Sequence, residues 1–308
     1  MRAIVCSPNA PDRIAFRDVP EPVASADECV IDVEAVSLNR GEYRRLGWAE
    51  EGWRPGYDVA GVVATEAADG SGPAAGTRVI GLLRDGAWSE RAAVPSRYVA
   101  PIPDGLGAAP ASTVPVAGLT SLAALAHGGP PIGRRVLITG AAGGVGRFAV
   151  QLAAIMGAKV SALVGSPERA AGLTALGAAE VLLELDGQGM PFDLVVESVG
   201  GEVLGNALAR LAPGGCLVSI GGSSDAPTTF DGLGFARKGP IRMVGMQLFS
   251  ELERQGMGRR EMGGLLELVA AGRLDPQIDR TASWREMGSL LRELGERRIA
   301  GKAVAFID

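Results

Sequence analysis

Two kinds of hydrophobic pattern divide the chain. In the first hundred residues, short runs alternate apolar and polar positions or consist of β-branched residues, as in residues 29–36, 58–65 and 77–83. Alternation with a period of two is typical of half-buried strands. Prolines also recur at short intervals, which disfavours helices. The pattern predicts a compact β-rich domain.

From about residue 118, apolar strands alternate with stretches rich in helix formers. Helices are expected at 146–156 and 167–176, each followed by a glycine stop. The expected strands between and after them are 135–139, 159–164, 180–185, 192–197 and 216–220. Strand–helix alternation with short connections predicts a parallel, doubly wound sheet, and so an α/β fold class.

The remainder carries two amphipathic segments, 263–271 and 284–297, followed by a last apolar strand at 302–307. No apolar run reaches 18 residues without glycine or charge, which argues against a membrane span. The first residues lack the apolar segment of a signal peptide. We therefore expect a cytoplasmic protein that is not bound to a membrane.

Composition and charge exclude several classes of binding site. Lys and Arg total 30 against 35 Asp and Glu, a net charge of −5 with scattered basic residues, which argues against a nucleic-acid partner. His127 is the single histidine, and we expect it at a helix C-terminus beside exposed carbonyls. Cys6, Cys29 and Cys216 are far apart, so neither a zinc cluster nor a disulfide framework is expected.

The strongest chemical signal is the glycine-rich turn after the strand at 135–139. In a dinucleotide fingerprint, Ala141 would permit the tight turn, Gly143 the approach of a pyrophosphate and Gly146 close helix packing. The unpaired N–H groups of the following helix would face the phosphates. The cofactor-binding residues predicted in this turn are Ala142, Gly143, Gly144, Val145 and Gly146.

The end of the next strand bears on cofactor choice. Enzymes that prefer NAD place an acidic residue there, whereas this chain has Gly165 and Ser166, with Arg169 nearby. Ser166 and Arg169 could bind a 2′-phosphate, which favours NADPH. Ser166 also fits an N-cap for a helix beginning at Pro167, and the two roles are compatible.

At this point the sequence resembles the medium-chain dehydrogenase/reductase superfamily, in its zinc-independent quinone oxidoreductase-like branch. The resemblance runs through nearly the whole chain. Its motifs lie at 35–39 (AVSLN), 55–63 (PGYDVAGVV), 76–79 (GTRV), 114–120 (VPVAGLT), 141–146, 192–197 (FDLVVE) and 300–304 (AGKAV).

The resemblance implies a split architecture. A GroES-like β-rich catalytic domain would comprise residues 1–118 and 249–308, and a Rossmann NADPH-binding domain residues 119–248. The active site would lie in the cleft between them, and the protein would be a homodimer. Three positions that hold catalytic zinc in related enzymes fall near Asn39, Tyr57 and Val116, so we expect no metal site.

Without a metal, zinc-free members of the family reduce quinones or activated C=C bonds. We therefore expect hydride transfer from NADPH to a small quinone or α,β-unsaturated carbonyl. The candidate catalytic residues are Asn39, Tyr57 and, more weakly, Tyr43. Asn39 could donate to a carbonyl or orient the ribose, or simply form an Asx turn. Tyr57 could donate a proton, or be a packed tyrosine.

Further cofactor contacts follow from the resemblance and from the edge of the sheet. Thr120 and Asn39 would contact the nicotinamide side of the cofactor. A loop after the strand at 216–220 would pass nearby, contributing Gly221, Gly222 and Ser223, and Phe249 would line the pocket.

Two alternatives remain open. One is an enoyl-thioester reductase of fatty-acid or polyketide-type metabolism, for which Arg44, Arg45, Arg237 and Lys238 could form a basic rim. The other is a non-catalytic NADPH-binding redox sensor or scaffold. Assays of cofactor oxidation with several acceptors would separate these possibilities.

Overall fold

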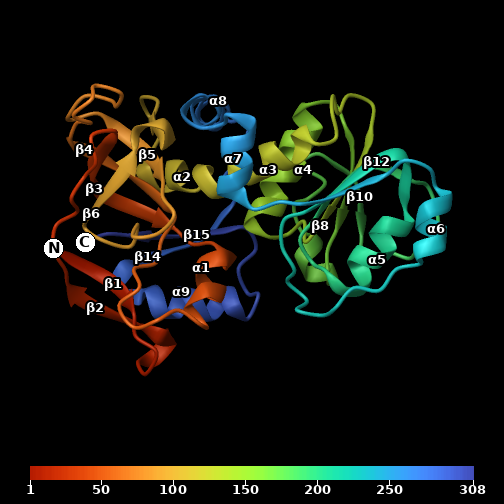
Figure 1. Cartoon of the computed structure of the whole chain (residues 1–308), viewed down its shortest axis with the longest axis horizontal. Coiled ribbons are helices and arrows are strands. Elements are labelled where there is room, and N and C mark those ends of the chain that lie inside the picture. Colours follow the sequence, from red (N-terminus) through yellow and green to blue (C-terminus); the bar gives the residue numbers. More distant parts are fainter. The chain divides into compact units, whose positions relative to one another are not determined.

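A computed structural model describes all 308 residues, and its chain forms two compact units (Figure 1). The first unit combines residues 1–119 with residues 256–308, and the second comprises residues 120–255. No helix is both long and apolar enough to cross a lipid bilayer. The mixed α/β class expected from the sequence is confirmed.

The first unit is built mainly on an antiparallel sheet. Strand β3 is central, because it pairs with β15, β4 and β6, and the sheet order is β14-β15-β3-β4-β5-β7. Strands β1 and β2 form a separate hairpin. Its strands are β1 (Arg2–Cys6), β2 (Ile14–Asp18), β3 (Glu28–Ser37), β4 (Asp58–Thr65), β5 (Arg78–Leu82), β6 (Arg91–Pro95), β7 (Val99–Pro101), β14 (Ile278–Ser283) and β15 (Lys302–Phe306).

Short helices cover this sheet. Helix α2 packs on β3 and β4, and α1 packs on α9. The α-helices here are α1 (Arg40–Leu46), α2 (Ala108–Ser112), α8 (Arg259–Ala270) and α9 (Met287–Gly295), with 3₁₀ turns at Pro11–Arg13, Ser96–Tyr98 and Trp284–Glu286. Helix α3 (Val114–Ala126) begins in the first unit and ends in the second.

The second unit is a six-stranded parallel sheet in the order β10-β9-β8-β11-β12-β13. The order reverses between β8 and β11, so this is a doubly wound sheet with one switch point. Its elements are β8 (Arg135–Thr139), α4 (Gly144–Ile155), β9 (Lys159–Leu163), a 3₁₀ turn (Pro167–Ala170), β10 (Ala178–Leu182), β11 (Phe192–Glu197), α5 (Gly201–Ala209), β12 (Leu211–Ser219), α6 (Gly232–Arg237), β13 (Arg242–Gly245) and α7 (Leu248–Gln255).

Helices lie on both faces of this sheet. Helix α4 packs on β8 and β9, and α5 packs on β12, with the two helices on opposite sides of the strands (Figure 1). Right-handed crossovers in the two directions from the switch point require this arrangement. The carboxyl ends of β8, β11 and β12 therefore meet at one edge, where doubly wound sheets bind ligands.

Two sequence expectations were wrong. The helix expected at 167–176 is only a 3₁₀ turn over Pro167–Ala170, because the backbone leaves the helical conformation at Ala171, with ψ of 131°, and Gly172 follows with φ of +79°. The β-rich first part also contains helix α1, which the charged segment after Asn39 did not suggest. The backbone N–H of Asn39 donates to the Glu42 carboxylate, as at a capped helix N-terminus.

Candidate functional site

A buried polar cluster in the first unit surrounds Asn39. Asp58 is completely buried at the start of β4 and accepts hydrogen bonds from Ser37 Oγ at 2.7 Å, Asn39 Nδ2 at 2.9 Å and the Val116 backbone N–H at 2.8 Å. A buried carboxylate requires such donors to offset its lost hydration. Asp58 thus connects β3, β4 and the N-terminal part of α3.

Lys302 supplies the positive charge of the cluster from the first residue of β15. Its ammonium donates to Asn39 Oδ1 at 2.7 Å and to the Leu38 carbonyl at 3.1 Å, and lies 3.5 Å from Asp58 Oδ2. Burial lowers the pKa of Lys302, and Asp58 opposes that shift. The Asn39 amide is therefore fixed at both ends by charged side chains.

Glu42 links the two leading catalytic candidates. Its side chain is buried on α1, and its carboxylate accepts from the backbone N–H of Asn39 at 2.6 Å and of Tyr57 at 2.7 Å. Burial, followed by the nearby Asp58 charge, raises the pKa of Glu42 to about 8. Sequence reasoning missed Glu42 and Lys302. An acidic residue three positions after Asn39 is the capping-box signal that would have drawn attention to Glu42.

The three candidate catalytic residues have different surroundings. Burial raises the pKa of the half-buried Tyr57 phenol, so it remains protonated at neutral pH, and its hydroxyl bonds to Arg45. The hydroxyl of Tyr43 instead lies against Gly295 of α9. The Asn39 amide directs its N–H groups to Asp58 and the Ser37 carbonyl, and its oxygen accepts from Lys302, which leaves the second lone pair of that oxygen for a further donor. Glu42 thus connects Asn39 with Tyr57 but not with Tyr43.

The glycine-rich turn of the second unit joins β8 to α4 closely. A Cβ at Gly146 would lie 2.4 Å from the Gly140 carbonyl oxygen and 2.7 Å from Ala141 Cα, so only glycine fits. Gly140 itself has φ of +59°. Helix α4 spans twelve residues, and the N–H groups of its first turn, from Gly144 to Gly146, have no acceptor within the helix. The turn can therefore hold an anion such as a pyrophosphate.

A second buried carboxylate organises the adjoining strand ends. Glu197, at the end of β11, accepts from Thr139 Oγ1 at 3.2 Å, Val199 N at 2.6 Å and Gly200 N at 2.8 Å. Ser198 in turn donates to Thr139 from its backbone N–H and from its hydroxyl. Burial raises the pKa of Glu197. Sequence reasoning missed this role, although Glu197 lies within a motif that it singled out.

The loop predicted to pass near the cofactor joins the same edge. Ile220 N donates to the Glu197 carbonyl at 2.8 Å, and Ser223 N donates to the Ser198 carbonyl at 3.0 Å. Gly222 has open space where a Cβ would stand. The structure therefore brings Gly221, Gly222 and Ser223 together with the ends of β8 and β11.

The end of β9 contains the residues predicted to select the cofactor. The Ser166 hydroxyl hydrogen bonds to the carboxylate of Glu168, which lowers the pKa of Glu168. No N-capping bond from the Ser166 side chain is formed, so the proposed capping role was wrong. Arg169 lies on the same short 3₁₀ turn, half-buried. An acidic side chain is thus present beside Ser166, a feature the sequence reasoning did not weigh.

Thr120 and Phe249 lie on helices of the second unit. Thr120 is buried on α3, and the Phe249 side chain is buried on α7. His127 follows α3, and its Nε2 lies 2.8 Å from Glu251 Oε1 of α7, so its side chain meets a carboxylate rather than the expected carbonyls. This pair joins α3 and α7.

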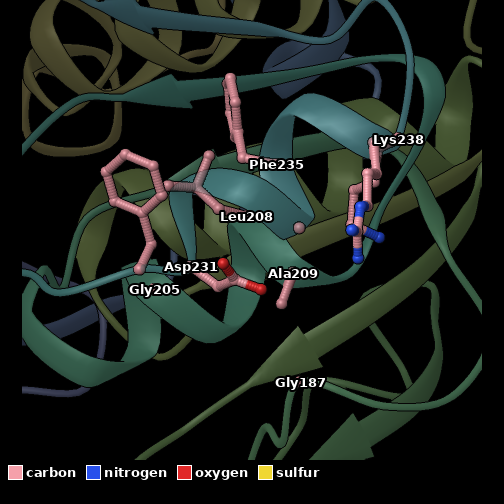
Figure 2. Close-up of a pocket in the computed structure, with 10 residues that line it drawn as sticks. Gly187, Gly205, Leu208, Ala209, Asp231, Phe235 and Lys238 are labelled. Atoms are coloured by element: carbon pink, nitrogen blue, oxygen red, sulfur yellow. The ribbon is translucent and has the colours of Figure 1, made fainter.

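A separate pocket of about 390 Å³ lies between α5 and α6 (Figure 2). Leu208, Phe230 and Phe235 supply apolar surface, and Arg237 and Lys238 supply positive charge. None of the predicted catalytic or cofactor-binding residues lines it. Two members of the suggested basic rim, Arg237 and Lys238, therefore belong to this pocket.

The residues present do not fit a metal ion. No three or more His, Cys, Asp or Glu side chains are arranged to hold one. The positions compared with zinc ligands carry Asn39, Tyr57 and Val116, and the Asn39 oxygen is already bonded to Lys302. We derive no chemical step through a metal.

Comparisons with known proteins can now be set beside this geometry. Residues 144–268 match the family model described as "Zinc-binding dehydrogenase". The chain is 33% identical over 310 residues to the spectinabilin polyketide synthase system protein NorB of Streptomyces orinoci, covering 95% of this chain but only 14% of NorB. It is also 33% identical over 195 residues to the acrylyl-CoA reductase AcuI of Ruegeria pomeroyi, covering 57% of this chain and 58% of AcuI.

Solved structures extend the similarity to the whole chain. The quinone oxidoreductase from Coxiella burnetii superposes with a TM-score of 0.85 at 27% identity, covering 100% of this chain and 99% of that one. Together with the family match, the parallel sheet and the glycine-rich turn, this likeness identifies an oxidoreductase fold. The chain belongs to the medium-chain dehydrogenase/reductase superfamily, in its quinone oxidoreductase-like branch.

Proposed function

We propose that the protein reduces a quinone or an α,β-unsaturated carbonyl with NADPH, without a metal ion. The observation that carries the proposal is the rigid mounting of Asn39 and Tyr57 on one buried carboxylate, Glu42. Glu42 fixes the backbone at Tyr57, and Arg45 binds the phenol oxygen. A protonated phenol held by these contacts can stabilise negative charge on an acceptor oxygen. Conjugated acceptors need little further help, because they spread that charge.

A nicotinamide cofactor fits the glycine-rich turn. The first turn of α4, which begins after Gly143, leaves N–H groups available to phosphates, and Gly222 leaves space at the neighbouring loop. The bound cofactor supplies the hydride. Ser166 and Arg169 support the choice of NADPH over NADH, against the charge of Glu168.

Tyr57 would donate a hydrogen bond to the acceptor oxygen and then its proton, while Asn39 Oδ1 would accept a ribose hydroxyl. Tyr57→Phe should lower turnover about 10- to 100-fold, the range expected from losing one donor to a developing oxyanion. NADPH affinity should change little, as measured by fluorescence titration. Unchanged turnover would remove Tyr57 as an acid.

A second candidate function is the reduction of an enoyl thioester. The similarity to a polyketide synthase over 95% of this chain, and to an acrylyl-CoA reductase, favours it. The chain spans only 14% of NorB and 58% of AcuI, so the activity of either whole protein is not assigned to it.

NADPH oxidation should be measured with a benzoquinone, a small enone and crotonyl-CoA as acceptors. Faster turnover of the benzoquinone and the enone than of crotonyl-CoA supports the proposal. Faster turnover of crotonyl-CoA supports the second candidate. Tight NADPH binding with no turnover of any acceptor would favour a non-catalytic NADPH-binding protein. Dialysis against a chelator should leave activity unchanged if no metal takes part.

We also propose a homodimer. Strand β13 lies at the edge of the parallel sheet with Arg242 and Met243 exposed, so its unpaired backbone groups are available to a second copy. Sedimentation analysis should give twice the 31.6 kDa chain mass. Met243→Pro, which removes a backbone donor at this edge, should shift the protein to monomers.

A further inference from the structure

Four buried N–H donors without an acceptor gather in one part of the first unit. They are Arg45 Nε, Trp53 Nε1, Arg54 Nε and Trp88 Nε1, out of five buried side-chain N or O atoms in the whole chain that lack a partner. An unpaired buried donor costs free energy comparable to a lost hydrogen bond. A cluster of them calls for a ligand or ordered water that accepts their protons.

The donors come from two neighbouring pieces of chain. The Arg45 guanidinium lies 4.4 Å from the centre of the Trp53 ring and 5.8 Å from that of Trp48. The backbone next to Trp53 pairs with the segment that carries Trp88, through Gly86 N to Arg54 O at 2.8 Å and Trp88 N to Pro55 O at 3.1 Å. Asp85 lies 4.0 Å from Arg45 and also acts on Arg54, so the two guanidinium groups share one acidic neighbour. These two arginines, with the Trp48 and Trp53 rings, are here called the Arg45 cluster, and Trp88 lies on the adjoining segment.

The Arg45 cluster is accessible and short of negative charge. The Arg45 side chain is 33% exposed and Trp48 is 72% exposed, so a small molecule can reach part of the Arg45 side chain, although its Nε is buried. Asp85 pairs with Arg45 at the long distance of 4.0 Å, and it is half exposed. Burial lowers the pKa of Arg54, and Asp85 opposes that shift, so one carboxylate faces two guanidinium groups.

The Arg45 cluster adjoins the proposed catalytic phenol. Arg45 hydrogen bonds to the Tyr57 hydroxyl, and because guanidinium is only a donor, the phenol oxygen accepts this bond. Three successive hydrogen bonds (anion to Arg45, Arg45 to Tyr57 and Tyr57 to the acceptor), together with the width of the guanidinium, place an anion held by Arg45 within about 10 Å of any oxygen held by Tyr57.

We infer that Arg45 and Arg54, with the Trp53 N–H, bind a carboxylate carried by the acceptor, so that the substrates are small α,β-unsaturated carbonyl compounds bearing a carboxylate. This inference rests on the proposed function. Guanidinium binds carboxylate through paired, charge-assisted hydrogen bonds, and the flanking indoles suit a small planar molecule.

The short distance to Tyr57 favours a carboxylate over a phosphate. In a thioester bound to coenzyme A or a carrier, the pantetheine arm separates the phosphates from the reacting carbonyl. A carboxylate attached to the enone lies only a few bonds from the carbonyl that Tyr57 would hold. The charge near the phenol therefore matches a small acid and not a carrier-bound acyl group.

The reaction balances without change at the carboxylate. The carbon β to the carbonyl gains a hydride, the C=C bond becomes a C–C single bond, and the electron pair moves onto the carbonyl oxygen as an enolate. The α carbon then gains a proton from Tyr57 or solvent. The carboxylate serves only for binding.

Binding can be tested without catalysis. Trp48 and Trp53, two of the four tryptophans, lie beside the Arg45 guanidinium, so their fluorescence should report a ligand there. The saturated acid 4-oxopentanoate should bind about 10- to 100-fold more tightly than its methyl ester. Arg45→Gln should abolish that preference, Arg45→Lys should retain part of it, and the distant exposed Arg17→Gln should leave it unchanged. Equal affinity for acid and ester in the wild type would overturn the inference.

Turnover separates this inference from the proposed function. The acceptor (E)-4-oxopent-2-enoate and its methyl ester share one enone and differ by one charge. For Arg45→Gln, kcat/KM for the acid should fall about 10- to 100-fold, while the value for the ester stays within about threefold. An equal fall for both compounds would overturn the carboxylate site. If neither compound is reduced but 4-oxopentanoate binds through Arg45, the carboxylate site stands and the proposed reductase function fails.

Discussion

The two units of the chain organise their polar groups in opposite ways. In the first, the arrangement around Asn39 depends on buried charged side chains, with Asp58 and Lys302 contributed by strands far apart in sequence. In the second, the edge formed by β8, β11 and β12 depends mostly on backbone N–H groups and short side chains, organised around the turn at Gly146 and the single carboxylate of Glu197.

The difference shows how each unit can fail. A charged cluster loses stability when one partner is removed, because the other charge remains buried. A turn held by backbone hydrogen bonds tolerates changes in nearby charge. It does not tolerate an added atom where two backbone segments are in close contact. The following predictions test this contrast, beginning with the largest effect.

Lys302→Met should be the most costly change in the first unit. It would leave Asp58 buried without its cation, which we expect to lower the free energy of unfolding by about 3–5 kcal/mol. Denaturation in urea would measure it. Arg298→Met, which removes an exposed pair with Glu296, is the matched control and should cost less than about 0.5 kcal/mol. Similar losses for the two variants would contradict the importance of the buried pair.

Gly146→Ala should be the corresponding failure of the second unit. The added Cβ would meet backbone atoms at 2.4–2.8 Å, so the turn must shift, at a cost of about 1–3 kcal/mol. Gly165→Ala, whose Cβ would meet nothing within 4 Å, should leave stability nearly unchanged. Thermal unfolding of both variants provides the comparison, and equal melting temperatures would show that the turn is more adaptable than the distances imply.

Glu42 should make the stability of the first unit depend on pH. Its pKa is about 8 in the folded chain against an ordinary value of 4.5, so between these values the native state holds a proton that the unfolded chain has released. Its contribution is complete below pH 4.5 and is lost as the pH rises through 8. Lys302, whose pKa is lowered by burial, acts in the opposite sense.

Relative to Glu42→Gln, the wild type should therefore lose about 2 kcal/mol between pH 6 and pH 8. Urea denaturation at both pH values measures the difference, and removing the carboxyl isolates its contribution from that of Lys302. A constant difference between the two proteins across this range would contradict the shift.

The smallest effect concerns the end of β9. Glu168→Gln removes a negative charge beside Ser166, which should tighten NADPH binding about two- to fivefold while leaving NADH binding unchanged. Fluorescence titration with each cofactor measures the two affinities. Weaker NADPH binding in this variant would mean that Glu168 helps to hold the cofactor, and would reverse the expected preference.

Much of the fold could be predicted because it depends on local pattern. The strand at 135–139 corresponds to β8, and the period-two alternation at 29–36 lies within β3. The helix predicted at 167–176 is not formed, because the extended conformation of Ala171 and the left-handed conformation of Gly172 cannot be recognised from residue type alone. Helix α1 was missed because most of its seven residues are charged, and too few are apolar to show a helical period.

The candidate site was less predictable because its contacts are long-range. The bond between Lys302 and Asn39 joins residues 263 positions apart, and no local pattern relates them. Likewise, the bond between Arg45 and Tyr57 depends on how α1 packs beside the start of β4. The turn at 139–146, by contrast, could be predicted, because the residues that shape it are neighbours in the sequence.

The position of β15 inside the sheet has a consequence for biosynthesis. Strand β15 lies between β14 and β3, so until residue 302 has been made, the growing chain presents β3 with an unpaired edge and Asp58 without its cation. The second unit, formed from continuous sequence, has no such dependence. We therefore expect the parallel sheet to fold while the chain is still on the ribosome and the split unit to require protection from aggregation until its last strand emerges.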